Sequence, residues 1–154
     1  MYVISLKLDK TKICATLAAL CLVIAVACVA FPRQASDVLN GNVNTTAKST
    51  EEHIAFLNAY GYNVVEKPLQ IQEVIIPSDF SSAYEKYNEF QKLSGFDLAK
   101  FKNCRVKKYT YKVVDYDNSS QEVIANLFVY DNKVVGGDIS STTLGGFTHG
   151  FVKE

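Results

Sequence analysis

The chain has 154 residues, with 16 basic and 16 acidic side chains and four cysteines. A net charge of zero, without a basic block, excludes the electrostatic footprint of a nucleic-acid-binding protein. Only Cys104 lies beyond residue 31, so the later part of the chain can build neither an internal disulfide framework nor a cysteine-based zinc site.

The first predicted element is an apolar run over residues 13–31, which carries no charged side chain. As a helix, it would span about 28 Å, close to the hydrocarbon thickness of a bilayer. Three lysines precede the run, whereas Arg33 is the only basic residue between it and Lys48. The positive-inside rule therefore predicts that residues 1–12 are cytoplasmic and that the rest of the chain, after a single membrane pass, is extracytoplasmic.

Two other interpretations of the run stay open. Cys28-Val29-Ala30 before Phe31-Pro32 has the small residues of a secretory cleavage site. Ala25-Val26-Ala27-Cys28 is a poor lipid-attachment box, because Ala stands three positions before the cysteine in place of Leu. We expect an uncleaved signal anchor, because the apolar run exceeds the roughly 7–15 residues of a signal-peptide core.

Small residues form a stripe along one face of this predicted helix. Such a stripe can be no more than a set of small residues that lipid accepts, or it can let a second helix approach closely and so support self-association. The candidate helix–helix seam consists of Cys14, Ala18, Cys21, Ala25 and Cys28.

A change of composition divides the remaining chain into a linker and a domain. Residues 32–50 are rich in Asn, Thr, Ser and Ala without an apolar period, which predicts a flexible linker. Residues 51–154 form the predicted extracytoplasmic domain, whose 11 basic and 14 acidic residues give it a formal charge of −3.

The domain begins with a predicted helix, strand and helix. Ser49 and Glu52 form a capping box for the first helix, Gly61 ends it, and His53 in its first turn is expected to face solvent. Residues 69–76 are typical of a strand. A second helix follows, with Ser82 and Glu85 as its capping box and Ser94-Gly95 at its end.

Three further strands are predicted. Residues 105–116 alternate, which points Lys108, Thr110 and Lys112 to water. Residues 122–130 are almost continuously apolar, which indicates a central strand, and Asp131-Asn132 forms a turn that tolerates positive φ before the next strand at Val134-Val135.

The order α-β-α-β-β-β predicts an α+β domain with an antiparallel sheet and helices on one face. The predicted core is Leu57, Ile75, Tyr84, Tyr87, Tyr109, Tyr111, Leu127, Val129 and Val135.

Five of the eight glycines fall within residues 136–150, beside hydroxyls, a carboxylate and a histidine. Three interpretations are open: tight packing by the glycines with Phe147 and Phe151 on the core, a non-catalytic binding surface, or a hydrolytic set of Asp138, a serine and His149. The segment has no GxSxG elbow and no phosphate-binding motif, and the sequence predicts no metal and no cofactor. The candidate binding surface is Gly136, Gly137, Asp138, Ser140, Gly146, Phe147 and His149.

An ordered set of short stretches runs through the domain: Asn58-Ala59-Tyr60-Gly61-Tyr62, Ile76-Pro77 with Phe80, Tyr87-Asn88 with Gln91-Lys92, Gly95-Phe96-Asp97-Leu98, Tyr109-Thr110-Tyr111, Ala125-Asn126-Leu127, Val129-Tyr130-Asp131, Gly136-Gly137-Asp138, and Gly146-Phe147 with His149-Gly150. Together they resemble a Firmicutes family known as domain of unknown function 4830. The resemblance implies a bacterial cell-surface protein with an anchor and one outer domain, and it implies no activity. Members often carry Cys shortly after the GGD stretch, where this chain has Ser140 and Ser141, which weakens a redox role.

These observations favour a non-enzymatic, membrane-anchored extracytoplasmic domain that binds or scaffolds an envelope component. Its expected partners are the lipid bilayer and an envelope protein or ligand. One alternative is a small extracytoplasmic hydrolase that uses the glycine-rich segment. Another is a sensor subunit that associates through its membrane helix.

Overall fold

A computed structural model describes residues 43–114, 116 and 121–152. The predicted span 13–31, with its seam of Cys14, Ala18, Cys21, Ala25 and Cys28, lies outside these residues, as do residues 1–12. Within the described ranges, no helix has both the length and the apolar character needed to cross a membrane.

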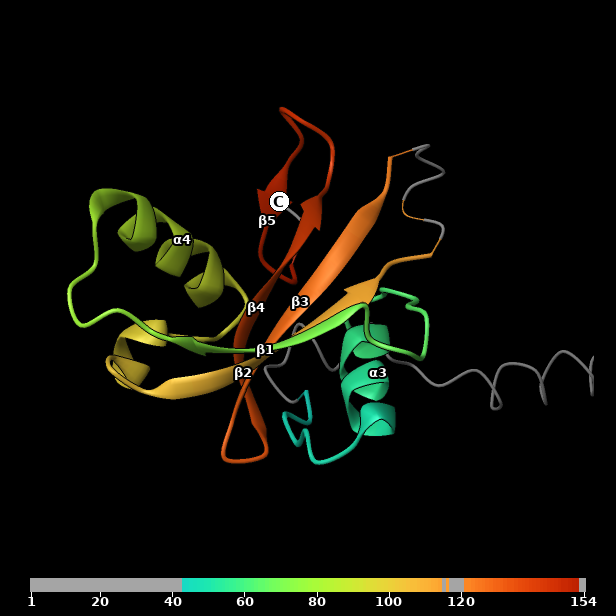
Figure 1. Cartoon of the computed structure of the whole chain (residues 1–154), viewed down its shortest axis with the longest axis horizontal. Coiled ribbons are helices and arrows are strands. Elements are labelled where there is room, and N and C mark those ends of the chain that lie inside the picture. The colour runs from blue at the N-terminus through green and yellow to red at the C-terminus, as the bar shows by residue number, and fades with distance from the viewer. Residues whose placement is uncertain (1–42, 115, 117–120, 153–154) are drawn as a thin grey trace, which may run out of the picture. The chain divides into compact units, whose positions relative to one another are not determined.

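The described chain forms two α-helices, a short 3-10 helix and one sheet (Figure 1). The five strands pair antiparallel in sequence order, so β3 is central. The α+β class and the predicted element order are confirmed, and the structure adds the 3-10 helix η1 and the short strand β5. The elements are α3 (Thr50–Ala59), β1 (Gln70–Ile75), α4 (Ser82–Leu93), η1 (Leu98–Phe101), β2 (Arg105–Lys112), β3 (Val123–Tyr130), β4 (Lys133–Ser141) and β5 (Thr148–His149).

The two α-helices cover opposite faces of the sheet, which corrects the prediction that both lie on one face (Figure 1). Leu57 of α3 and Leu127 of β3 belong to the larger core cluster. Tyr87 of α4 packs instead with Phe128, in a second cluster. Successive strand residues point to opposite faces, so we name these the α3 face and the α4 face. The nearly continuous apolar run of β3 explains the arrangement, because both of its faces need cover.

The domain begins before residue 51. Residues 45–47, which were expected to belong to the flexible linker, lie along the β3–β4 turn in the structure. The Ala47 N–H donates to the Asn132 carbonyl at 2.8 Å, and the Val134 N–H donates to Thr45 at 2.8 Å. Ala47 is buried in the core. These backbone hydrogen bonds anchor a segment whose polar composition gave no sign of packing.

Helix α3 has the predicted cap but a different buried face. Ser49 is the N-cap, and its side chain accepts a hydrogen bond from the Glu52 N–H. His53, expected in solvent, is only 3% exposed, which overturns that prediction. The helix turns His53 toward Tyr111 of β2, with which it forms a 2.7 Å hydrogen bond. This hydrogen bond to the sheet offsets the cost of burying the polar imidazole ring.

The second helix begins one residue before its predicted box, because the side chain of Ser81 accepts from the Tyr84 N–H and caps the helix. The Asp131-Asn132 turn is confirmed, with φ of 46° and 58°.

Most of the predicted core residues are buried, but the prediction placed the wrong isoleucine at the end of β1 in the core. Ile75 is 60% exposed, whereas Ile76 is 1% exposed and packs in the second cluster. β1 is an edge strand, and Ile75 lies on a part of the α3 face that α3 does not reach. Of the tyrosines predicted for the core, Tyr84, Tyr87 and Tyr109 are half-buried. The remaining predictions, all buried, are Leu57, Tyr111, Leu127, Val129 and Val135.

Candidate functional site

The glycine pair of the predicted binding surface lies in β4 beneath α4. Gln91 of α4 is fully buried, and its side-chain amide donates to the Gly137 carbonyl at 2.7 Å and accepts from the Gly137 N–H at 2.8 Å. A Cβ on Gly136 would lie 2.8 Å from the Gln91 side chain, and one on Gly137 would lie 2.1 Å from the Asn126 carbonyl oxygen. Gly136 therefore admits a close approach of α4 to β4, and Gly137 admits a close approach of β4 to β3 and Phe151, as in the packing interpretation.

Asp138 belongs to a buried polar row on the α4 face. Its carboxylate accepts hydrogen bonds from the Tyr87 hydroxyl at 2.7 Å, the Asn126 amide at 2.9 Å and the Ser140 hydroxyl at 2.5 Å. Thr110, predicted to face water, is buried and donates to Asn126 at 2.8 Å. Burial and the nearby Asp138 raise the pKa of the Tyr87 hydroxyl, which therefore remains a proton donor to the carboxylate. Every acceptor in this row has a donor, which suits a structural role.

His149 lies on the other face of the sheet. It pairs with Ile139 of β4, whose side chain is part of the α3-face core, whereas Asp138 points to the α4 face. The His149 ring bonds to the Gly150 carbonyl at 2.6 Å through Nδ1 and to the Tyr116 hydroxyl at 2.9 Å through Nε2. Because a carbonyl only accepts, Nδ1 carries the proton and Nε2 accepts from Tyr116.

The hydrolytic arrangement of Asp138, a serine and His149 is therefore not assembled in the described residues. The carboxylate orients Ser140 and Tyr87, and the imidazole orients toward Tyr116 instead. Phe147 stacks on His149 with ring centroids 5.3 Å apart. Gly146 completes the β4–β5 loop, where a Cβ would lie 2.6 Å from that of Ser141. The seven residues of the predicted surface are thus divided between two faces and a loop.

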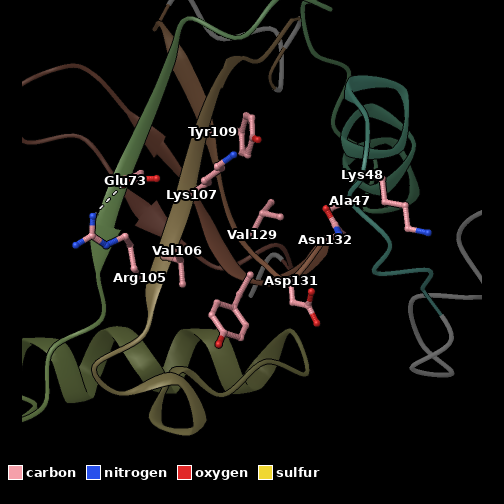
Figure 2. A pocket seen from close by; sticks show the side chains of 11 residues that line it. Ala47, Lys48, Glu73, Arg105, Val106, Lys107, Tyr109, Val129, Asp131 and Asn132 are labelled. Atoms are coloured by element: carbon pink, nitrogen blue, oxygen red, sulfur yellow. Dashed lines mark hydrogen bonds and ion pairs between the residues drawn. The ribbon is translucent and has the colours of Figure 1, made fainter.

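A groove of about 380 Å³ opens on the α3 face, where α3 leaves the sheet uncovered (Figure 2). In Figure 2, Val129 lies between the strand that carries Lys107 and the segment that carries Ala47 and Lys48. Tyr109 also lines the groove and packs against the His53 ring, with centroids 4.4 Å apart. The N-terminal segment, β2 and the β3–β4 turn therefore build the groove together.

The rim of this groove carries charges of both signs. Glu73 and Arg105 form an ion pair at 3.2 Å, and Asp131 lies at the β3–β4 turn. Among the described residues, neither Lys48 nor Lys107 forms an ion pair. In Figure 2 the Lys107 side chain lies beside Tyr109, whereas the Lys48 side chain points away from the groove, so the Lys107 ammonium group is the one available to an anionic side chain there. Most of the lining side chains are charged or polar, so the groove offers ion pairs and hydrogen bonds beside the apolar surface of Val129 and Tyr109.

Sequence reasoning missed this groove, although one signal for it was present. Along one face of β2, the side chains change from Arg105 and Lys107 to Tyr109 and Tyr111. This change marks where the cover by α3 ends. The opposite wall, at Ala47, comes from a segment interpreted as a linker.

The fold and the groove define the class: a small α+β domain with a five-stranded antiparallel meander, helices on both faces and an open, charged groove. A family model described as a domain of unknown function (DUF4830) matches residues 56–139, more than half of the chain. The protein therefore belongs to this family, as the ordered short stretches suggested. No curated protein and no solved structure matches the chain.

Proposed function

We propose that this chain is a non-enzymatic binding domain, held outside the cell membrane by residues 13–31, whose groove takes a segment of another envelope protein. The observation that carries the proposal is the groove itself. Val129 and Tyr109 supply its apolar surface, while Lys48 and Lys107 stand on its rim without ion-pair partners. An acidic side chain of the partner would pair with Lys107.

The anchor is supported by the length of the apolar run and by the excess of lysine before it. Thr45 and Ala47 already bond to the β3–β4 turn, so at most about a dozen residues of the predicted linker would separate the span from the domain. A tether of this length reaches about 20 Å as a random coil. The groove would then meet partners embedded in or attached to the same membrane.

Charge reversal at Lys107 tests the proposal, and Lys108 provides the matched control. The two lysines are neighbours in β2, but Lys107 lines the groove and Lys108 points to the α4 face. Lys107→Glu should reduce chemical crosslinking of the full chain to its envelope partner in native membranes about tenfold or more. Lys108→Glu should leave it within about twofold of the unchanged chain.

Mass spectrometry of the crosslinked products provides the measurement. The same partner protein must disappear with Lys107→Glu and persist with Lys108→Glu. Equal losses for both variants, or no loss for either, would contradict a binding role for the groove.

A further inference from the structure

The free edge of the sheet at β1 is unusually open. β1 pairs with β2 on one side only, and five of its six residues are exposed. Ile71 and Ile75 are 57% and 60% exposed. The opposite edge is the two-residue strand β5, which is too short to offer much backbone. Natural proteins usually protect an edge strand with Lys, Pro or a bulge, and β1 has none of these within its bounds.

The backbone of β1 offers hydrogen bonds to a further strand. The Ile76 N–H donates to the Cys104 carbonyl on the β2 side, at 3.0 Å. Because backbone groups alternate in direction along an antiparallel strand, the N–H and C=O groups of Ile71, Glu73 and Ile75 point to the free edge. Three consecutive outward positions are therefore available for pairing.

The side-chain pattern of β1 is close to a palindrome about Glu73. The strand reads Ile71-Gln72-Glu73-Val74-Ile75, with isoleucine at equal distances on either side of the glutamate. A two-fold axis at Glu73 would place Ile71 of one copy opposite Ile75 of the other. This self-complementarity is what an isologous interface requires.

Charge is compatible with the same axis. Two glutamates would meet there, but each is paired with Arg105 of its own chain at 3.2 Å, as Figure 2 marks with a dashed line. The axis thus gathers two negative and two positive charges. The two β2 strands, which carry Lys107 and Lys108, would lie about 14 Å apart across the two β1 strands. Repulsion between their lysines is then largely screened, since the Debye length is about 8 Å at physiological salt.

We infer that the β1 edge takes a second copy of this chain, forming a two-fold dimer with a continuous ten-stranded sheet. The axis stands perpendicular to the sheet at Glu73. Pairing of five residues buries far less than the roughly 1,600 Å² of a standard interface, so the dimer is weak in free solution. Tethering both copies to one membrane raises their effective concentration and favours the pairing. The inference does not depend on what the groove binds.

Disulfide crosslinking of the full chain in membranes tests the pairing and its register. The four native cysteines are replaced by alanine, and two differently tagged chains, Ile71→Cys and Ile75→Cys, are co-expressed and oxidised. Opposed positions should crosslink, so the mixed 71–75 product is expected to exceed the 71–71 product at least fivefold. In the 71–71 pair, the two positions are offset by about 13 Å along the strands.

Lys86→Cys, on the exposed side of α4, is the matched control and should give only background dimer. Glu73→Cys provides a second variant at the axis itself, and it should crosslink with its own kind. The inference is overturned if neither variant pair exceeds the Lys86→Cys background, or if 71–71 and 71–75 products form equally. A product at the mass of another protein would also overturn it, because the edge would then belong to a different polypeptide.

Discussion

Gln91 should be among the most costly polar residues to replace in this domain. Its amide satisfies both the N–H and the C=O of Gly137, at 2.8 and 2.7 Å, inside a fully buried site. Gln91→Met keeps the length of the side chain and removes both hydrogen bonds. Each buried group left unpaired costs about 1–3 kcal/mol, so the free energy of unfolding should fall by about 2–6 kcal/mol.

Urea unfolding of the chain from residue 43 onward, followed by circular dichroism, measures this change. For a domain of this size, each 1 kcal/mol corresponds to a fall of about 4–8 °C in Tm, so Gln91→Met should lower Tm by at least about 8 °C. Lys86→Met, on the exposed side of the same helix, should change the free energy by no more than about 0.5 kcal/mol. A loss below about 1 kcal/mol for Gln91→Met would refute the reasoning, because the Gly137 groups would then have found other partners.

Two further changes probe the interior. Burial lowers the pKa of His53 below its ordinary value of 6.5, so the unfolded state takes up a proton first as the pH falls. The contribution of His53 to the free energy of unfolding is then complete above pH 6.5 and is lost as the pH falls through the lowered pKa. His53→Gln should flatten this decline in urea titrations from pH 7.5 to 5. An unchanged dependence of the free energy on pH would contradict the assignment. Gly137→Ala would place a Cβ 2.1 Å from the Asn126 carbonyl oxygen, and overpacking of this kind costs about 1–3 kcal/mol or more. Gly145→Ala has open space around the new Cβ but also lies at positive φ, 75°, so it should cost only the backbone strain of about 1–2 kcal/mol. The excess cost of Gly137→Ala over this control measures the close approach, and an equal cost would argue against it.

Local signals predicted the elements of this fold well. The Ser49 cap and the Asp131-Asn132 turn depend on residues within a few positions of one another, and both occur as predicted, although the Glu52 carboxylate of the capping box accepts from the Lys48 N–H and not from Ser49. The central position of β3 followed from its nearly continuous apolar run, interrupted only by Asn126, which is typical of a strand covered on both faces. A strand that is apolar on both faces implies a helix on each face of the sheet. The apolar run was therefore informative, and only the conclusion that both helices lie on one face was wrong.

Long-range partners decided the positions that were predicted wrongly. His53 is buried because Tyr111, 58 residues later, meets its Nδ1 atom. Thr110 is buried because Asn126 stands directly opposite on β3. No window of neighbouring residues contains either partner. Ile75 and Ile76 are equally apolar, but only Ile76 faces the second cluster, where it packs with Leu98 of η1 and Val106 of β2.

The candidate binding surface was predicted from composition, which did not point to the groove. Glycines and hydroxyls cluster in residues 136–150, but Gln91 and Asn126 account for the glycine pair and for Asp138. The groove draws its walls from residues 47–48, 105–109 and 129–132. Such a site becomes visible only when strand register is known, because register decides which lysine faces the groove.

Groove and edge strand lie on one continuous surface, and this has a consequence for how the domain would act. Glu73 belongs both to the groove rim and to the proposed two-fold axis. An axis perpendicular to the sheet keeps the α3 faces of both copies on the same side, so the two grooves would open side by side. A partner with two acidic segments, or two partners in one membrane, would then be held with a gain in avidity that needs no new contact. Weak pairing at β1 and weak binding in each groove would therefore reinforce one another. Lys107 stands directly opposite Glu73 across β1 and β2, so Lys107→Glu also adds negative charge beside the axis; its loss of the 71–75 crosslink should be larger when the partner is present than when it is absent.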